Sequence, residues 1–286
     1  MPIDVVSLSP ALGAEVSGLD LRRPLPEVTI REVYSAWLQH HVLVFRGQNL
    51  SDDDQRRVTG YFGDLQDLTR TAPALRQATQ KVMYIGNVVI NGIRGDLPDG
   101  EMQFHTDGAY FERPTKATAL YAVLVPAVGG DTMFSDGFKA LASLPAAVRR
   151  RIETLQAMNV YDYASGGTQR NVAPSAEAPR FVHPVVIAHP ETGQPALYVN
   201  RLMTTEIIGL PRAEGDALLE VLFQAVERPE FIYSHKWRVG DLVVWDNRGI
   251  FHARTWFDPA EKRALRRMTV KGERHVGVRS QAPLPA

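Results

Sequence analysis

The segment Glu101-Met-Gln-Phe-His-Thr-Asp-Gly108 contains the residue types best suited to chemistry. His105 and Asp107 are two positions apart, so on an extended strand both side chains would leave the same face. An imidazole and a carboxylate on one face supply two of the three ligands of a 2-His-1-carboxylate site, which holds Fe(II) and leaves positions open for substrates. The chain has eight histidines, and a pair with this spacing also arises by chance on a protein surface. The pair therefore needs support from the rest of the sequence.

His252 is the candidate third metal ligand. It ends the block Trp245-Asp-Asn-Arg-Gly-Ile-Phe-His252, directly after an apolar segment, residues 242–245, that predicts a buried strand. A histidine near such a strand can be held close to a metal whose other ligands lie elsewhere in the chain.

Arg263 and Arg267 are the candidate binding residues for acidic molecules. They are four positions apart in a predicted strand, so both face the same way, and Arg266 faces the opposite side. Inward-facing arginines are costly unless they meet anions, and a guanidinium group binds a carboxylate in bidentate fashion. The alternative is an edge strand with exposed arginines. Thr132 is a candidate hydroxyl donor to the same anion.

The composition excludes several classes of site. Lys and Arg total 32, as do Asp and Glu, so no net charge attracts nucleic acid or an acidic membrane surface. Cysteine is absent, which removes disulfides, thiolate metal ligands, iron–sulfur clusters and cysteine nucleophiles. There is no basic leader with an apolar run and no apolar stretch long enough to span a membrane, so we expect a cytoplasmic protein. A metal site must use His, Asp, Glu and water.

The elements that would position these residues are mostly strands with a few helices. Amphipathic periodicity predicts helices at 27–40 and around 218–226, and a capping box at Ser51 and Asp54 predicts a helix that extends to about residue 62. Residues 136–157 are predicted to be helical in two pieces, broken at Pro145. Strands are predicted at residues 3–8, 14–19, 41–45, 82–85, 117–125, 181–188, 196–199, 242–245, 250–253 and 265–271.

This pattern predicts one domain over residues 1–286, a strand sandwich or barrel rather than a βαβ array, with residues 279–286 as a flexible tail. The turn-rich segments 86–101 and 164–180 are candidates for mobile cover over a site, and simple disorder is the alternative. The three arginines at 149–151 are interpreted as a solvated helix face.

Several blocks in a fixed order resemble the taurine dioxygenase / 2,4-dichlorophenoxyacetate dioxygenase (TauD/TfdA) family of Fe(II)- and 2-oxoglutarate-dependent oxygenases. The resemblance covers residues 5–272, nearly the whole chain. The blocks are G-A-E-V-S-G-L-D-L (13–21), H-V-L-V-F-R-G-Q (41–48), F-H-T-D (104–107), G-G-D-T (129–132), H-P-V-V-I-A-H-P (183–190), L-Y-V-N (197–200), G-D-L-V-V-W-D-N-R (240–248) and R-A-L-R-R-M-T (263–269).

The resemblance implies a mainly β fold, a double-stranded β-helix (jelly roll) with flanking helices. It implies that His105, Asp107 and His252 bind Fe(II), and that Thr132 and Arg263 bind the far carboxylate of 2-oxoglutarate. It also implies hydroxylation of a substrate by O₂, with release of succinate and CO₂ and, for some substrates, cleavage of a C–O or C–S bond. Halogenating relatives lack the carboxylate ligand, so Asp107 favours hydroxylation. The other six histidines match no ligand position.

For the substrate, the resemblance assigns Arg267 to the anionic end of a small organic acid, a carboxylate, sulfonate or sulfate. We expect the apolar part of that acid to lie near Phe104, and Glu101 to repel an anion or bind an amine. No taurine-specific pattern is present, so taurine is not the expected substrate.

Two other functions remain open at this point. They are a non-catalytic jelly-roll ligand sensor and a zinc-type metallohydrolase, which would need the three metal ligands without the 2-oxoglutarate residues. A nucleic-acid substrate is disfavoured because no basic, aromatic-interleaved stretch is present. A homo-oligomer is the default expectation for the family, with no interface assigned.

Overall fold

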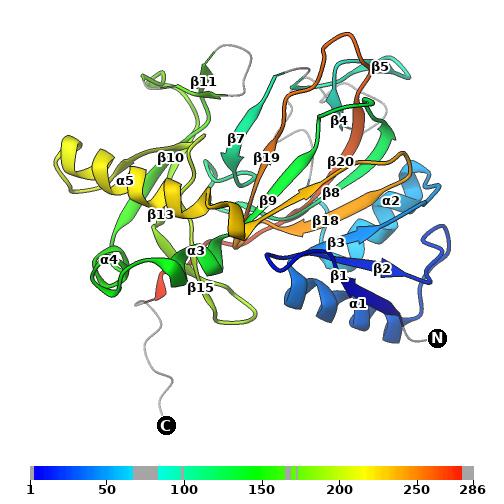
Figure 1. Cartoon of the computed structure of the whole chain (residues 1–286), viewed down its shortest axis with the longest axis horizontal. Coiled ribbons are helices and arrows are strands. Elements are labelled where there is room, and N and C mark those ends of the chain that lie inside the picture. Colours follow the sequence, from blue (N-terminus) through cyan, green and yellow to red (C-terminus); the bar gives the residue numbers. More distant parts are fainter. Residues whose placement is uncertain (1–2, 67–82, 98–99, 165–168, 172, 279–286) are drawn as a thin grey trace.

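A computed structural model describes residues 3–66, 83–97, 100–164, 169–171 and 173–278 of the chain. Within these ranges, two antiparallel-rich sheets form the centre of the molecule and helices cover their outer faces (Figure 1). Within the same ranges, every helix is too short or too polar to reach across a lipid bilayer.

The larger of the two sheets, called the large sheet below, has strands that are antiparallel to their neighbours except for one parallel pair near its edge. In spatial order, its strands in the described part of the chain are β1 (Asp4–Ser7), β2 (Ala14–Ser17), β3 (Val42–Phe45), β18 (Leu242–Asp246), β8 (Thr115–Leu124), β20 (Ala264–Lys271) and β4 (Met83–Gly86).

The second sheet, called the small sheet below, contains both segments that carry the candidate metal ligands. Its described strands, in spatial order, are β17 (Ile232–His235), β9 (Thr132–Asp136), β19 (Ile250–Arg254) and β7 (Met102–His105). The remaining strands form smaller groups: β13 (Arg180–Pro184), β10 (Gln156–Val160) and β16 (Thr204–Ile207); β14 (Val186–Ala188) and β15 (Pro195–Leu197); β11 (Tyr163–Ala164) and β12 (Gln169–Arg170); β5 (Val89–Ile90) and β6 (Ile93–Arg94).

Side-chain alternation in the central strands divides the core into layers. In β18, Leu242 and Val244 pack toward the helices, whereas Val243 and Trp245 pack between the two sheets against Phe134 and Ile250 of the small sheet. Strands buried on both faces need apolar residues at every position, which is why this strand is a continuous apolar run. The two facing sheets form the predicted jelly roll.

Helices close the outer faces of both sheets. The helix α1 (Glu27–His40) and the helix α2 (Asp52–Thr59) cover the large sheet, and α2 begins with the predicted capping box of Ser51 and Asp54. The helices α3 (Gly137–Ser143), α4 (Ala146–Ile152) and α5 (Arg212–Val226) lie on the other side of the molecule, and α3 and α5 bury apolar residues against the small sheet (Figure 1). Short 3₁₀ turns follow at Gly60–Phe62 and Pro229–Phe231.

Most predicted elements are confirmed, with one clear error. The helix expected to reach Ala157 ends at Ile152, and the chain then forms β10, which pairs with β13 and β16. Only these long-range partners make the segment extended, because Ala157 and Val160 are buried between elements that are distant in sequence. Strands β5, β6, β10, β11, β12, β16 and β17 were not predicted, and β7 was considered only as an extended segment that carries His105. Residues 279–286, the expected tail, lie outside the described residues.

Candidate metal centre and its cavity

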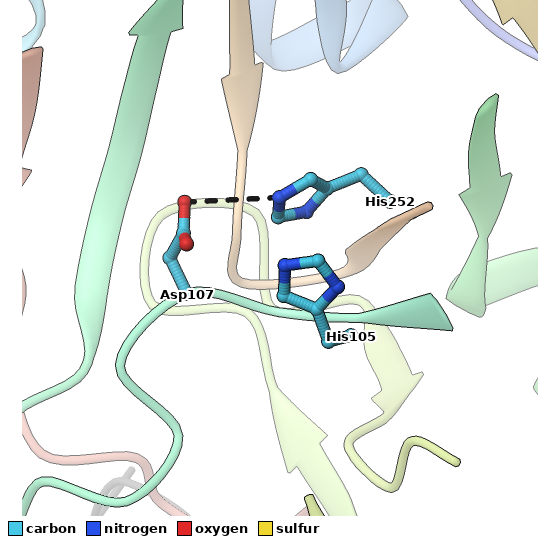
Figure 2. Close-up of side chains that lie close together, drawn as sticks. All are labelled: His105, Asp107 and His252. Carbon is cyan, nitrogen blue, oxygen red and sulfur yellow. Dashed lines mark ion pairs between the residues drawn. The ribbon is translucent and has the colours of Figure 1, made fainter. Parts of the chain in front are cut away.

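The three candidate metal ligands meet at the edge of the small sheet (Figure 2). His105 ends β7 and lies directly opposite His252 of the neighbouring strand β19, with ring centroids 4.0 Å apart. Asp107 Oδ2 lies 3.9 Å from His252 Nε2. One possible ligand atom from each of the three residues can be chosen so that all lie within 4.8 Å of one another, and no other group of three or more such residues is found in the described part of the chain.

Asp107 reaches the site by a turn and not by strand alternation. Strand β7 ends at His105, and Asp107 begins the turn that follows. Gly108 continues that turn with φ of 73°, a conformation that residues with a Cβ rarely adopt. The expectation that an extended strand presents both side chains on one face is therefore wrong in its geometry, although the two side chains do converge.

Both histidines are held in the neutral form that binds metals. Burial lowers the pKa of His105, and burial together with the adjacent His105 ring lowers the pKa of His252 well below its ordinary value. His105 Nδ1 lies 2.9 Å from the carbonyl oxygen of Gln103, which fixes the proton on Nδ1 and leaves the Nε2 lone pair free. A backbone carbonyl bonded to the far nitrogen is the usual support of a metal-binding histidine.

Asp107 remains ionised because of its charged neighbours. Burial raises the pKa of its carboxyl group, but the positive Arg267 guanidinium and the hydrogen bond from Thr118 act against burial, and the pKa lies below the usual range. Arg267 Nη2 lies 2.9 Å from Asp107 Oδ1, and the Thr118 hydroxyl donates to Oδ2 at 2.5 Å. Two neutral imidazoles and one carboxylate form a donor set that suits Fe(II) and similar divalent ions, so these residues fit the metal that the sequence implies.

A buried arginine without an acidic partner lies in the same cavity as the ligands. Arg263 is 2% exposed, and among the described residues its guanidinium donates to the carbonyl oxygens of Gly130 and Ile85 and forms no ion pair. Gly130 allows this approach, because a Cβ there would lie 3.1 Å from Arg263 Nε. Burial, with the positive Arg254 nearby, lowers the pKa of Arg263 to about 9. An anion in the cavity would compensate this buried charge.

Thr132 lines the cavity with Arg263, and a tryptophan orients its hydroxyl group. Trp237 Nε1 donates to Thr132 Oγ1 at 3.0 Å. An indole nitrogen can only donate, so the threonine oxygen must accept here and its own hydrogen is left to donate elsewhere. Thr132 is therefore prepared to donate to an anion. Trp237 was not singled out from the sequence, because nothing in its spacing connects it with Thr132.

The three arginines of the C-terminal strand divide as predicted. Arg263 and Arg267 face the cavity, and Arg266 faces α2, where it contacts Asp52, Gln55 and backbone carbonyl oxygens. The alternative of an exposed edge strand is wrong, because β20 lies between β8 and β4 and all three side chains are at most 8% exposed.

Two expected substrate contacts are not brought to this cavity. Phe104 packs in the core between the small sheet and α5, and Glu101 is exposed and lines a separate surface pocket. The pairing of β7 with β19 shifts between His252 and Arg254, so that Met102 pairs with Arg254 while His105 pairs with His252. Such a bulge lets Met102 and His105, which are three positions apart, both face the cavity, and Phe104 faces the opposite side because it directly precedes His105 in the strand.

The walls of the cavity away from the charged groups are apolar. The side chains that form them are Met83, Ile85, Leu97, Met102, Tyr110, Leu120, Tyr161 and Met203. Two segments, 86–101 and 164–180, were expected to cover the site. The described part of the first contains the strand pair β5–β6 and Leu97, which lines the cavity, and the strand pair β11–β12 lies at the start of the second. Residues 98–99, 165–168 and 172 lie outside the described residues.

The remaining histidines have structural surroundings. His189 Nε2 lies 3.0 Å from Asp246 Oδ2, and His235 Nε2 lies 3.1 Å from Asp241 Oδ2, both away from the cavity. The residues missed from the sequence that matter most are Thr118 and Asn247, which contact Asp107. The W-D-N-R block before His252 was the available signal for Asn247; Thr118 had none.

Comparison with known proteins gives the family of the chain. The family profile described as "Taurine catabolism dioxygenase TauD, TfdA family" matches residues 4–269. An alpha-ketoglutarate-dependent 2,4-dichlorophenoxyacetate dioxygenase from Cupriavidus pinatubonensis is 32% identical over 92% of this chain and 95% of its own length. An alkylsulfatase from Acinetobacter baylyi is 31% identical over 94% of this chain and 85% of its own. The crystal structure of a taurine dioxygenase from Burkholderia xenovorans has a TM-score of 0.82 and 29% identity, covering 97% of this chain and 92% of its own.

Proposed function

The chain belongs to the TauD/TfdA family of 2-oxoglutarate-dependent dioxygenases, and from that we propose that it oxidises a small organic acid with His105, Asp107 and His252 as the Fe(II) ligands. The enzyme class follows from the family. The ligand, co-substrate and substrate residues are our proposal.

The observation that carries this proposal is that a His–Asp–His cluster shares one cavity with Arg263, a buried arginine that forms no ion pair with any carboxylate in the described part of the chain. A zinc hydrolase would need the cluster but not Arg263, and a ligand sensor would not need to keep two histidines neutral beside a carboxylate. We assign Arg263 and Thr132 to the far carboxylate of 2-oxoglutarate, since one supplies a planar pair of donors and the other an oriented hydroxyl group.

With Fe(II), 2-oxoglutarate and O₂ bound, the centre supplies oxidation of a substrate C–H bond, coupled to decarboxylation of the keto acid to succinate and CO₂. The residues of the chain contribute position and environment. Neutral imidazoles and an ionised Asp107 are ready to bind the metal without first releasing protons. The apolar walls exclude water from the reacting carbon.

Arg267 is our candidate for the anionic end of the substrate. Its Nη2 contacts Asp107, and its Nη1 lies 3.5 Å from Met83 Sδ, a weak acceptor. An anion bound to this guanidinium would lie beside Asp107, so the adjoining carbon of the substrate would be next to the metal. Names of relatives include a carboxylate, a sulfate and a sulfonate substrate, all of which a guanidinium group can bind.

The walls of Met, Leu, Ile and Tyr side chains favour an acid with an apolar body. The described lining contains no carboxylate other than Asp107 to receive a substrate ammonium group. We therefore propose an alkyl or aryl carboxylate, sulfonate or sulfate ester as the substrate class.

The test begins without oxygen. Metal-free protein is titrated with Fe(II), 2-oxoglutarate is added, and the visible charge-transfer band of a chelated keto acid is sought. Candidate acids are then added, and succinate release is measured in air. We expect the band, and succinate formation that rises with the right acid. Folded, iron-loaded protein without a band would contradict chelation of the keto acid and bring back the hydrolase and sensor alternatives.

A further inference from the structure

A chain of hydrogen bonds with one fixed direction leads to Asp107. Trp245 Nε1 donates to Asn247 Oδ1 at 3.0 Å, Asn247 Nδ2 donates to Thr118 Oγ1 at 3.0 Å, and Thr118 Oγ1 donates to Asp107 Oδ2 at 2.5 Å. Trp245, Asn247 and Thr118 are each at most 1% exposed. Below, these three residues are called the relay.

The direction of every bond in the relay follows from its two ends. An indole nitrogen can only donate, so the atom of Asn247 that faces Trp245 must be the amide oxygen. The backbone N–H of Asp107 approaches the same oxygen at 3.3 Å, which agrees with this assignment. The amide nitrogen then faces Thr118 and occupies its oxygen as an acceptor. The single hydroxyl hydrogen of Thr118 is left for the carboxylate, which can only accept.

The relay and Arg267 hold the two oxygens of Asp107 separately. Thr118 contacts Oδ2, and Arg267 contacts Oδ1 at 2.9 Å. These contacts come from β8 and β20, which pair so that Thr118 lies opposite Thr269. A carboxylate that begins a turn has little support from its own strand, and here neighbouring strands supply the support. Side chains behind the ligands of a metal set ligand orientation and typically change metal affinity 10- to 100-fold when removed.

We propose that Thr118, oriented by Asn247 and Trp245, is a positioning residue that holds the Asp107 carboxylate in the direction required for metal binding. This inference rests on the proposed function, in which Asp107 is a metal ligand. It assigns a role to the W-D-N-R block: Trp245 and Asn247 orient the carboxylate ligand that lies far from them in sequence, while His252 follows in the same segment.

The test measures Mn(II) affinity by the electron paramagnetic resonance signal of free Mn(II) during titration of the metal-free enzyme, without any co-substrate. Thr118→Val keeps the shape and removes the hydroxyl group, and we expect its affinity to fall by about 10-fold or more. Thr118→Ser keeps the hydroxyl group and should stay within about threefold of wild type. Asn247→Asp offers Thr118 an oxygen in place of the amide nitrogen, draws its hydrogen away from Asp107, and should resemble Thr118→Val.

Thr269→Val is the matched control. Thr269 is a threonine at 1% exposure, opposite Thr118 in the adjacent strand, and its hydroxyl group has no hydrogen-bond partner among the described residues. The same change of shape and polarity there should leave Mn(II) affinity unchanged. Melting temperatures of all metal-free variants separate loss of folding from loss of binding, and Thr118→Ala replaces Thr118→Val if the latter does not fold.

Three results would overturn the inference alone. The first is normal Mn(II) affinity in Thr118→Val or its replacement, and the second is an equal loss in Thr118→Ser, since packing and not the hydroxyl group would then be responsible. An equal loss in the Thr269→Val control would also overturn it. Absence of saturable Mn(II) binding by the wild-type protein would overturn the proposed metal site, and the role of the relay with it.

Discussion

Buried arginines lie on both faces of the segment that contains strand β20, and they differ in whether the protein supplies an acidic partner. On the face toward α2, Arg266 is 6% exposed and contacts the Asp52 carboxylate, the Gln55 side chain and the carbonyl oxygen of Leu50. On the face toward the cavity, Arg263 is 2% exposed, donates to the carbonyl oxygens of Gly130 and Ile85, and forms no ion pair with a carboxylate of the described residues. The two residues are three positions apart in the chain, and both are buried.

The comparison separates a structural charge from a binding charge. A buried charge is costly unless a partner compensates it, and the protein itself supplies that partner for Arg266. For Arg263 we propose that most of the compensation comes from an anionic molecule that enters the cavity. Arg267 is intermediate, because it has a protein partner in Asp107 and also faces the cavity. Burial alone would not distinguish the three residues.

The largest effect that would test the comparison is expected at Arg263. In the proposed assignment, Arg263→Ala removes the pair of guanidinium donors to the far carboxylate of 2-oxoglutarate and leaves the Thr132 hydroxyl group in place. The affinity for 2-oxoglutarate should therefore fall about 100-fold or more. Stability should not fall much, because an uncompensated buried charge is lost together with the contacts. Affinity is measured by anaerobic titration of the Fe(II) enzyme with 2-oxoglutarate. Arg263→Lys, which keeps the charge without the planar fork, should lie between. Unchanged affinity would place the keto acid elsewhere.

Arg266→Met should give the opposite result. It leaves Gln55 and the carbonyl oxygen of Leu50 without their donor and loosens α2, so we expect the free energy of unfolding to fall by about 3 kcal/mol. Urea denaturation measures this change. The folded fraction of the variant should bind 2-oxoglutarate as wild type does. A loss of 2-oxoglutarate affinity with unchanged stability would reverse the distinction between the two faces.

Arg267→Ala should affect the organic acid and spare the metal. Loss of the anion contact should raise KM for the acid substrate about 30-fold, roughly 2 kcal/mol. Mn(II) affinity should change far less than in Thr118→Val, because the lost support of Oδ1 is offset by removal of a cation that competes with the metal for Asp107. Substrate-independent turnover of 2-oxoglutarate should persist. Steady-state succinate release, with and without the acid, gives both values, and an unchanged KM would contradict the assignment of Arg267.

The smallest effect comes from a buried group that is neutral. Both ring nitrogens of His275 are buried without a hydrogen-bond partner among the described residues, and burial, aided by the nearby His183, lowers the pKa of His275 to about 3. The unfolded chain, with an ordinary histidine pKa of about 6.5, takes up its proton first as the pH falls. Stability contributed by the neutral ring is therefore present above about pH 6.5 and decreases below it.

His275→Leu should remove this part of the pH dependence. The drop in the free energy of unfolding between pH 7 and pH 5 should shrink by about 2 kcal/mol relative to wild type. Denaturation at both pH values measures it, with Mn(II) affinity at pH 7 as the control that should not change. An unaltered pH dependence would mean that the ring is protonated in the folded protein. His275 would then be a buried charged group, like the arginines of the C-terminal strand, and not a buried neutral one.

Much of the architecture could be predicted because it depends on local patterns. Three such patterns each depend on residues that are close in sequence. They are the capping box of Ser51 and Asp54, the helical period of residues 27–40 and the apolar run that ends at Trp245. The opposite facing of Arg266 and Arg267 follows from strand alternation alone. Strand β10 was missed because its extended form depends on pairing with β13 and β16, which no local pattern reports.

The sequence by itself determined the kinds of groups at the site: two imidazoles, a carboxylate, a threonine and arginines, in an order that identifies the family. Only the tertiary structure decided which of them meet. A bulge between β7 and β19 turned Met102 to the same side as His105, and a turn brought Asp107 to the histidines. Thr118 of β8 came to the Asp107 carboxylate, and Asn247, which follows β18, came to its backbone N–H. The sequence gives the type of each residue, but the direction of a hydrogen bond depends on both partners. Here the partners of Asp107 are 11 and 140 positions away from it in the chain, so only the folded structure brings them together.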